Sequence, residues 1–195
     1  MKKVFVFTLI ILNAVVCYGE IAKSRFKITE SEEEFDVTYY LTEDMQIIPN
    51  LSNNDVTVTQ SFKLGDGELR YSLFTDLGGS EDTLQIDYAM WVFMCLSNIS
   101  GREITGNQIS VFNDSDVQAE FNGDFGCTAF IVSPSSEYSK GYSFMMVEFF
   151  YKKNQGLVMR TFLFNDISFA GISPDGQMNP DNILNRNYHT FRFMD

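Results

Sequence analysis

The sequence predicts one α+β domain over residues 35–195, with an antiparallel sheet of about six strands packed against one long helix and a short C-terminal helix. The chain has 195 residues, of which 45% are hydrophobic and 15% aromatic. This apolar content is enough for a single core in a chain of this length. Several short stretches alternate between apolar and polar residues, as strands do, and one longer stretch repeats its apolar residues at helical spacing.

The first predicted strands lie before the long helix. Residues 35–41 are rich in aromatic and β-branched side chains, which favour a strand. Apolar and polar residues then alternate over 56–64 and again over 69–73, so each stretch has one apolar face. The Gly-Asp-Gly of 65–67 separates the two stretches, and Asp-Gly tolerates the positive φ angles of a tight turn. The sequence therefore predicts a β-hairpin here.

Residues 81–99 are predicted to form the long helix. Ser80 is a suitable N-cap, because its hydroxyl can accept a hydrogen bond from the first turn, and Gly101 follows the last apolar residue. Apolar residues recur every three or four positions: Leu84, Tyr88, Trp91, Cys95 and Ile99. Further apolar side chains over 89–94 widen this stripe, which indicates a helix buried against a sheet along most of its length.

The chain returns to predicted strands after the helix. Apolar residues on both faces of 142–151 indicate a strand that is covered on both sides. A turn containing Gly156 then leads into a returning strand, so a second hairpin is predicted. The elements predicted for this half are strands at 109–112, 126–132, 142–151 and 157–164 and a short helix through Ile183 and Leu184.

The N-terminus has the three-part layout of a secretory signal peptide. Two lysines precede an apolar run over 4–16, and small residues follow it. The run is shorter than the roughly 20 apolar residues of a transmembrane helix. The sequence therefore predicts a signal peptide over 1–19 with cleavage after Gly19, then a flexible acidic lead-in over 20–34. Cleavage removes two lysines and no acid, so the net charge of −12 becomes −14.

The three cysteines leave two alternatives open. Cys17 is the acylated residue if the protein is a bacterial lipoprotein, and a lipid would then anchor the chain to the membrane. Cys95 and Cys127 remain in the mature chain, and an oxidising compartment allows them to form a disulfide. Each of them lies within an apolar run, where buried free thiols are also common.

The sequence lacks the residue patterns of common catalytic sites. His189 is the only histidine, so a histidine-rich zinc site is excluded, and a Ser-His-Asp triad would depend on this one residue near the C-terminus. No glycine-rich phosphate-binding motif occurs. The 26 acidic residues against 14 basic ones disfavour binding to nucleic acid. We therefore expect no catalytic residue, no metal site and no cofactor.

Three groups of acidic residues could instead form a catalytic or calcium-binding site. Asp116, Glu120 and Asp124 are the carboxylates that a hydrolase would use. Residues 113–116 and 175–181 contain the acidic and amide side chains that bind calcium, but neither has the glycine and terminal glutamate of the twelve-residue calcium loop. Short clusters of this kind are usually turns or helix caps, which is the interpretation we favour.

The order of the predicted elements resembles the Mog1/PsbP-like fold family. Four segments carry the resemblance: residues 142–151, 157–164 with the preceding Gly156, 182–184, and 188–193. They are similar to the closing hairpin, last helix and terminal edge of that fold, and the resemblance covers about residues 35–193. The Pro-x-x-Trp near the start of many members has no counterpart here. The resemblance implies a non-catalytic binding or assembly factor and carries over no catalytic residue.

Together these observations predict an exported, non-enzymatic protein of the bacterial envelope, periplasmic or extracellular, that binds another envelope protein. Contact with the membrane is expected only if Cys17 is acylated. The alternative function is a carrier of a small apolar ligand, whose pocket would be lined by Trp91, Phe144, Phe149 and Phe150. The two functions differ in whether these aromatic side chains surround a cavity or pack closely.

Overall fold

The computed structural model describes residues 22–25, 37–41, 44–48, 58, 60–74, 84–153, 155–170, 182–187 and 190–194. Within these ranges the chain forms two antiparallel sheets with helices packed on them. Several features considered above lie outside the described residues: the predicted signal peptide with Cys17, the acidic cluster 175–181, and His189. The fold is therefore derived from the remaining segments.

Seven strands form the main sheet, in the spatial order β3-β4-β5-β9-β8-β7-β6, and neighbouring strands are antiparallel throughout. The strands are β3 (Met45–Ile48), β4 (Gln60–Leu64), β5 (Gly67–Phe74), β6 (Ile109–Val111), β7 (Phe125–Val132), β8 (Phe144–Lys152) and β9 (Gly156–Phe164). β9 lies at the centre, and all of its residues are buried. A strand with apolar residues on both faces is expected at this position, because both faces of the sheet are covered.

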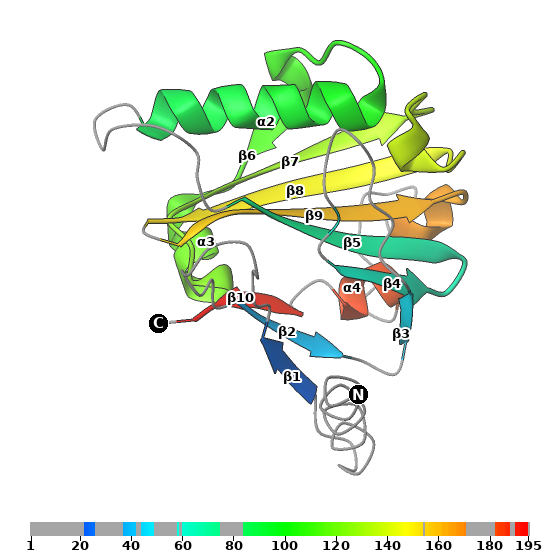
Figure 1. Cartoon of the computed structure of the whole chain (residues 1–195), viewed down its shortest axis with the longest axis horizontal. Helices are drawn as coiled ribbons and strands as arrows, with labels where there is room; N and C mark the ends of the chain where they lie inside the picture. Colours follow the sequence, from blue (N-terminus) through cyan, green and yellow to red (C-terminus); the bar gives the residue numbers. More distant parts are fainter. Residues whose placement is uncertain are drawn as a thin grey trace, which may run out of the picture.

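Helix α2 (Leu84–Ser100) covers one face of the main sheet, and a smaller layer covers the other (Figure 1). This layer is a three-stranded sheet in the order β1-β2-β10, accompanied by two short helices. Its elements are β1 (Ala22–Arg25), β2 (Val37–Leu41), β10 (Phe191–Phe193), α3 (Asp114–Phe121) and α4 (Ile183–Arg186). Three 3-10 turns complete the described elements: η1 (Gly106–Gln108), η2 (Glu137–Ser139) and η3 (Ile167–Ala170).

Alternating side chains of the central strands divide the core into two clusters. On β8, Val147 and Phe149 pack in the cluster beneath α2, whereas Phe150 packs in the cluster beneath β10. Phe191 of β10 lies 5.7 Å from Phe150 between ring centroids, and the two rings are stacked. The aromatic residues of this sequence therefore fill both faces of one sheet, as successive residues of a strand must.

The predicted α+β class with an antiparallel sheet is confirmed, but the predicted count of about six strands is wrong. Seven strands form the main sheet and three more form the second sheet. β1 and β3 are four residues long and show no period-two alternation that would identify them. β1 also lies within residues 20–34, for which a flexible lead-in was expected, and it pairs with β2.

Helix α3 was also absent from the prediction, which placed a break in a strand at this point. Asn113 caps the helix, because its side chain accepts a hydrogen bond from the Ser115 amide at 3.2 Å. Only Val117 and Phe121 of the helix are buried. Two large apolar residues in an eight-residue segment give too weak a helical period to recognise in the sequence.

The long helix and the two hairpins lie where they were expected. α2 spans Leu84–Ser100, and the predicted N-cap Ser80 and residues 81–83 of the helix predicted over 81–99 lie outside the described residues. Gly65 has a φ of 57° in the turn between β4 and β5, a conformation that favours glycine. No helix among the described residues is long and apolar enough to cross a membrane.

Candidate functional site

Glu68 and Arg70 form a buried ion pair on β5, on the side of the main sheet that α2 covers. They are two residues apart, so their side chains point to the same face of the strand. Arg70 Nε donates to Glu68 Oε1 at 3.2 Å, and Arg70 Nη2 donates to Glu68 Oε2 at 3.0 Å. This bidentate contact holds both side chains in a fixed orientation.

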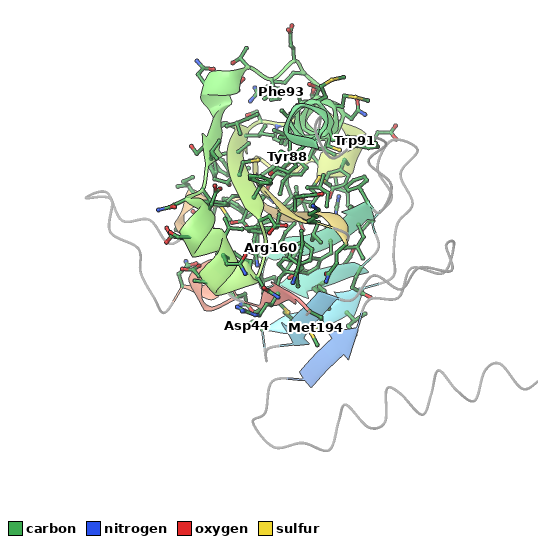
Figure 2. The ribbon with its side chains drawn as sticks, turned by 90° about the vertical axis from the view of Figure 1, so that its left-hand side faces the viewer. Asp44, Tyr88, Trp91, Phe93, Arg160 and Met194 are labelled. Carbon is green, nitrogen blue, oxygen red and sulfur yellow. The ribbon has the colours of Figure 1, made fainter. Side chains whose placement is uncertain are left out.

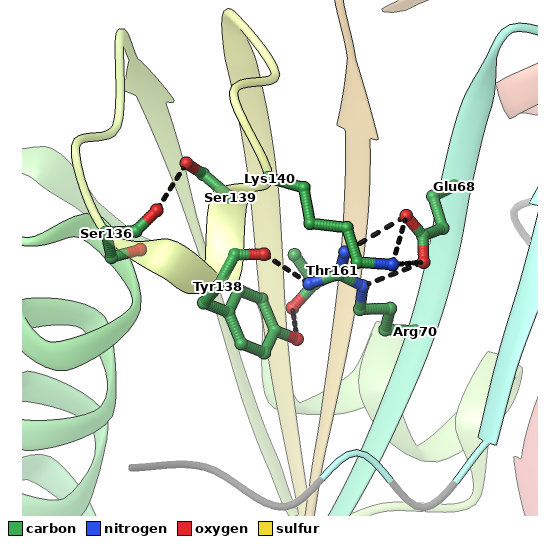
Figure 3. Close-up of polar contacts among 7 residues, drawn as sticks. All are labelled: Glu68, Arg70, Ser136, Tyr138, Ser139, Lys140 and Thr161. Carbon is green, nitrogen blue, oxygen red and sulfur yellow. Dashed lines mark hydrogen bonds and ion pairs between the residues drawn. The ribbon is translucent and has the colours of Figure 1, made fainter. Parts of the chain in front are cut away.

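The turn at η2 closes over the ion pair (Figure 3). The Tyr138 carbonyl accepts a hydrogen bond from Arg70 Nη1, and the Arg70 Cζ atom lies 4.7 Å from the centroid of the Tyr138 ring. The Tyr138 hydroxyl donates to Thr161 Oγ1 on β9 at 3.2 Å. Lys140 Nζ lies 3.1 Å from Glu68 Oε1. One carboxylate therefore binds two cations, and the turn is tied to both β5 and β9.

The same turn is attached to the end of α2. The Ser135 amide donates to the Ser100 carbonyl at 2.8 Å, and the Ser136 hydroxyl donates to the Ile99 carbonyl. Both acceptors are carbonyls of the last helical turn, which have no partner within the helix. The Ser139 hydroxyl donates to the Ser136 carbonyl at 2.7 Å and tightens the turn itself. The position of Lys140 is therefore fixed relative to both α2 and the sheet.

Glu68 and Tyr138 keep their ordinary charges at neutral pH. Burial raises the pKa of Glu68, but the hydrogen bond and charge of Arg70, followed by those of Lys140, outweigh burial and leave the pKa below its usual value. Burial raises the pKa of the Tyr138 hydroxyl, although the charge of Arg70 opposes this. Glu68 thus stays ionised and Tyr138 stays protonated, so neither group is suited to proton transfer near pH 7.

A cleft of about 450 Å³ opens beside Glu68 and Lys140. We call it the polar cleft, and its lining residues are Lys63, Asp66, Glu68, Lys140, Gly141, Tyr142 and Asn165. They come from the β4–β5 hairpin, the turn after η2 and the segment after β9. Charged and amide side chains line most of the cleft, in contrast with the aromatic pocket expected of a carrier for apolar ligands.

The four aromatic residues proposed to line such a pocket do not surround one cavity. Trp91 and Phe149 belong to the cluster beneath α2, and Trp91 lies 5.6 Å from Phe74 between ring centroids. Phe144 and Phe150 belong to the cluster on the opposite face of the sheet. Figure 2 views α2 along its axis and shows Trp91 on its sheet-facing side. The main sheet therefore separates the two pairs.

The outward side of α2 is the second candidate site. Met90 and Met94 are one helical turn apart and are 57% and 56% exposed. Ala89 beside them is also exposed. We call these three residues the outer face of α2. No charged residue occurs in the helix from Tyr88 to Ser100, whereas the exposed face of a surface helix is ordinarily polar or charged.

Two of the three carboxylates considered for a hydrolase lie one turn apart on α3, and the third lies before β7. Asp116 and Glu120 are exposed on α3, and Asp116 belongs to its first turn. Asp124 precedes β7, and its Oδ2 atom accepts a hydrogen bond from the Lys153 amide at 2.6 Å. Asp124 thus stabilises the turn of the β8–β9 hairpin. Among the described residues, no group of three or more His, Cys, Asp and Glu side chains is arranged to hold a metal ion.

Cys95 of α2 and Cys127 of β7 are buried free thiols, so the structure contains no disulfide between them. Burial raises the pKa of Cys95 to about 12 and that of Cys127 to about 11. The Tyr88 hydroxyl lies 3.4 Å from Cys127 Sγ. The two cysteines therefore act as core residues of the interface between α2 and the sheet.

Comparisons with known proteins assign the chain to no family. No protein-family model matches the sequence, and no significant match occurs among curated proteins.

Sequence analysis identified neither site. Glu68 and Arg70 alternate with the apolar Leu69 and Tyr71, and the alternation over 69–73 was interpreted as a strand with one apolar face. The structure instead covers both faces of β5. Two opposite charges at a two-residue spacing were a usable signal for the ion pair, but Lys140 is 72 positions from Glu68 and no local pattern connects them. The helix with its apolar residues over 89–94 was predicted to be buried against the sheet along most of its length, and the exposure of Met90 and Met94 corrects that prediction.

Proposed function

We propose that this chain is an exported, non-enzymatic protein that binds another protein of the bacterial envelope through the outer face of α2. The observation that carries the proposal is the exposure of Met90 and Met94 in the helix segment from Tyr88 to Ser100, which contains no charged residue. Contiguous apolar surface of this kind marks interaction sites on soluble domains. Methionine is well suited to such a surface, because its flexible thioether adapts to the shape of a partner.

The net charge of the chain indicates which kind of molecule binds the outer face of α2. With a net charge of −12, two copies of the chain repel each other, and an anionic lipid surface also repels it. A protein partner with apolar side chains surrounded by Lys and Arg combines burial with electrostatic attraction. We therefore assign the outer face of α2 to a partner with a basic rim around an apolar segment.

The ionisable groups in the described core support a binding role over a catalytic one. Arg70 and Lys140 already engage the Glu68 carboxylate. Arg160 does the same for Glu148, at 2.6 Å from Arg160 Nη2 to Glu148 Oε2. A general base needs an accessible lone pair, and these two carboxylates are buried and bound to cations.

The resemblance to the Mog1/PsbP-like fold belongs to the same proposal. It is supported by the antiparallel pairing of β8 with β9 across the turn before Gly156, and by α4 followed by the edge strand β10 at the C-terminal end. A non-catalytic binding or assembly role is what this resemblance implies.

Export is proposed from the signal peptide predicted at 1–19. Cleavage after Gly19 would leave Glu20 as the first residue, two positions before β1 begins at Ala22. The second sheet would therefore survive processing intact. Intact-mass measurement of protein recovered from the envelope fraction is expected to give a chain that starts at Glu20. A mass increase matching a lipid on Cys17 would instead assign the protein to the lipoproteins, and retention of residues 1–19 would contradict export.

The binding proposal is tested with the double variant Met90→Gln/Met94→Gln, which removes the apolar face without changing charge. A fluorescent amphipathic helical peptide of leucine and lysine serves as the probe, because it has the chemistry proposed for the partner. We expect its affinity, measured by fluorescence anisotropy, to fall about tenfold or more, since each buried methionine contributes about 1.5–3 kcal/mol.

The matched control is Ile167→Gln, which removes an apolar side chain that is 52% exposed outside α2. This variant should bind the peptide as the wild type does. Equal losses in both variants, or no loss in the double variant, would show that the peptide recognises the acidic surface in general and would contradict the assignment to α2.

A further inference from the structure

The polar cleft has a local charge opposite in sign to that of the whole chain. Three cations meet there: Lys63 and Lys140 line the cleft, and Arg70 lies behind it in contact with Glu68. The acidic residues at the cleft are Asp66 and Glu68. The lining residues alone are neutral, so the surplus of one positive charge comes from the buried Arg70 behind them, in a chain with 26 acidic and 14 basic residues. Such a local excess favours an anionic ligand.

Glu68 is already bound by two cations of the protein. Its two oxygens are engaged by Arg70 and by Lys140, and its exposed fraction is only 3%. Lys63 lies directly opposite Glu68 in the pairing of β4 with β5, so the two side chains share one face of the sheet. Within the described part of the chain, Lys63 Nζ has no ion-pair partner. Lys63 is therefore the cation left to bind a ligand.

The remaining lining supplies space and hydrogen-bond donors. Gly141 has a φ of 80°, and a Cβ atom at this position would meet nothing within 4 Å. The Oδ1 atom of Asn165 accepts from the amide and hydroxyl of Ser143, so the side-chain nitrogen of Asn165 is left to donate. Tyr142 is half-buried and forms an apolar part of the wall.

We propose that the polar cleft binds a small molecule through one carboxylate group. Lys63 forms the main ionic contact, and Lys140 and the Asn165 side-chain amide donate to the carboxylate oxygens. The surplus of one charge matches a monoanion, whereas a dianion such as phosphate would face repulsion from Asp66 and Glu68. The volume of about 450 Å³ lies in the lower part of the range for small-molecule sites and suits a ligand of amino-acid size.

This site is independent of the outer face of α2. The carboxylate ligand is held by residues of β4, the turn after η2 and the segment after β9, and none of them belongs to α2. The Met90→Gln/Met94→Gln variant should therefore bind the carboxylate normally. Failure of one proposal leaves the other standing.

The test is a titration of the ¹⁵N-labelled protein followed by NMR, with N-acetylglycine as the monocarboxylate probe. We expect saturable shifts centred on the amides of Lys140, Gly141 and Tyr142. The cationic glycinamide should cause no saturable shift there. Inorganic phosphate at pH 8, where it is mainly a dianion, should bind at least fivefold more weakly than N-acetylglycine.

Two variants assign the contacts. Lys63→Gln should weaken N-acetylglycine at least fivefold, whereas Lys153→Gln makes the same charge change at the exposed β8–β9 turn and should leave the affinity unchanged. Asn165→Asp keeps the acceptor for Ser143 but replaces the donor nitrogen with a negative charge, so it should also weaken binding. Absence of saturable shifts, equal effects of the two lysine variants, or equally tight binding of glycinamide or phosphate would overturn the proposal.

Discussion

Glu148 on β8 and Arg160 on β9 lie directly opposite each other, and their charged groups meet in a layer closed to solvent. Arg160 Nε donates to Glu148 Oε2 at 2.7 Å, and the two side chains are 1% and 0% exposed for Glu148 and Arg160. Aromatic rings surround the guanidinium, whose Cζ atom lies 5.2 Å from the centroid of Phe162 and 5.4 Å from that of Phe150. Each charge thus depends on the other, because water does not reach them.

Replacing Glu148 with Gln is therefore expected to lower the free energy of unfolding by about 3–5 kcal/mol, as removal of one partner from a buried pair does. The charged guanidinium of Arg160 would remain among aromatic rings with a neutral acceptor. Urea unfolding followed by circular dichroism measures the loss. Glu103→Gln, an amide substitution at an exposed residue after α2, is the control and should change stability by less than about 0.5 kcal/mol.

The double variant Glu148→Leu/Arg160→Met separates pairing from burial. Replacing both charges with apolar groups of similar volume is often neutral or stabilising. We expect the double variant to be more stable than Glu148→Gln alone. A double variant that is less stable would show that the hydrogen bonds of the pair stabilise the fold by more than the burial of its two charges destabilises it.

The depressed pKa of Glu68 predicts a pH dependence of stability. A carboxyl group with a folded-state pKa below its unfolded value of about 4.3 binds fewer protons when folded, so stability rises with pH through this window. The stability that ionised Glu68 contributes is complete above about pH 5. It is lost as the pH falls through the folded-state pKa of Glu68, which is below the unfolded value. Urea unfolding between pH 7 and pH 3 measures the slope.

Glu68→Gln should reduce this slope and should lower stability at pH 7 by about 1.5–3 kcal/mol, the usual contribution of hydrogen bonds to charged groups. Arg70 would then keep the Tyr138 carbonyl and ring, and only a neutral amide oxygen would replace the carboxylate. Asp66→Asn, an exposed change in the same hairpin, should leave the slope between pH 5 and 3 near that of the wild type. An unchanged slope in Glu68→Gln would contradict the assignment of this titration to Glu68.

The regular parts of the fold could be predicted because local residues determine them. Gly65 and Asp66 lie between two alternating stretches, so the β4–β5 hairpin follows from turn chemistry and a period of two. α2 follows from its helical period. β1 could not be predicted, because Ala-Lys-Ser-Arg acquires its structure only by pairing with β2, which is distant in the sequence.

The two candidate sites could not be predicted from the sequence, because tertiary contacts decide which side chains are buried and which are exposed. The alternation around Glu68 and Arg70 is the same whether one face of β5 or both are covered, and only the approach of η2 decides this. Met90 and Met94 are apolar residues in an apolar segment, so composition assigns them to the core. Their exposure follows from the packing of one side of α2 on the sheet, which hydropathy alone does not specify.

The raised thiol pKa values predict that Cys95 and Cys127 react slowly in the folded protein. At pH 8 both thiols stay protonated, because their pKa values are about 12 and about 11, and the thiolate is the reactive form. Labelling by iodoacetamide, located by mass spectrometry of peptides, should be about a hundredfold slower than in 6 M guanidinium. A disulfide-linked peptide from unreduced protein would contradict the free thiols of the structure.

The contact between Gly101 and the Ser135–Ser136 segment predicts that replacing this glycine lowers stability strongly. Gly101 has a φ of 72°, and a Cβ atom there would lie 2.6 Å from Ser135 Oγ and 2.8 Å from the Ser136 amide nitrogen. Gly101→Ala thus combines the left-handed conformation, which costs about 1–2 kcal/mol, with an overlap that costs about 1–3 kcal/mol more. Urea unfolding measures the sum.

Gly141→Ala is the matched comparison, because Gly141 has a similar φ of 80° but open space around the position of a Cβ atom. It should lose only the conformational part, so the difference between the two variants isolates the close approach of the η2 segment to the end of α2. If both variants lose the same stability, the segment can shift without cost. The hydrogen bonds from Ser135 and Ser136 to the last carbonyls of α2 would then not hold it rigidly.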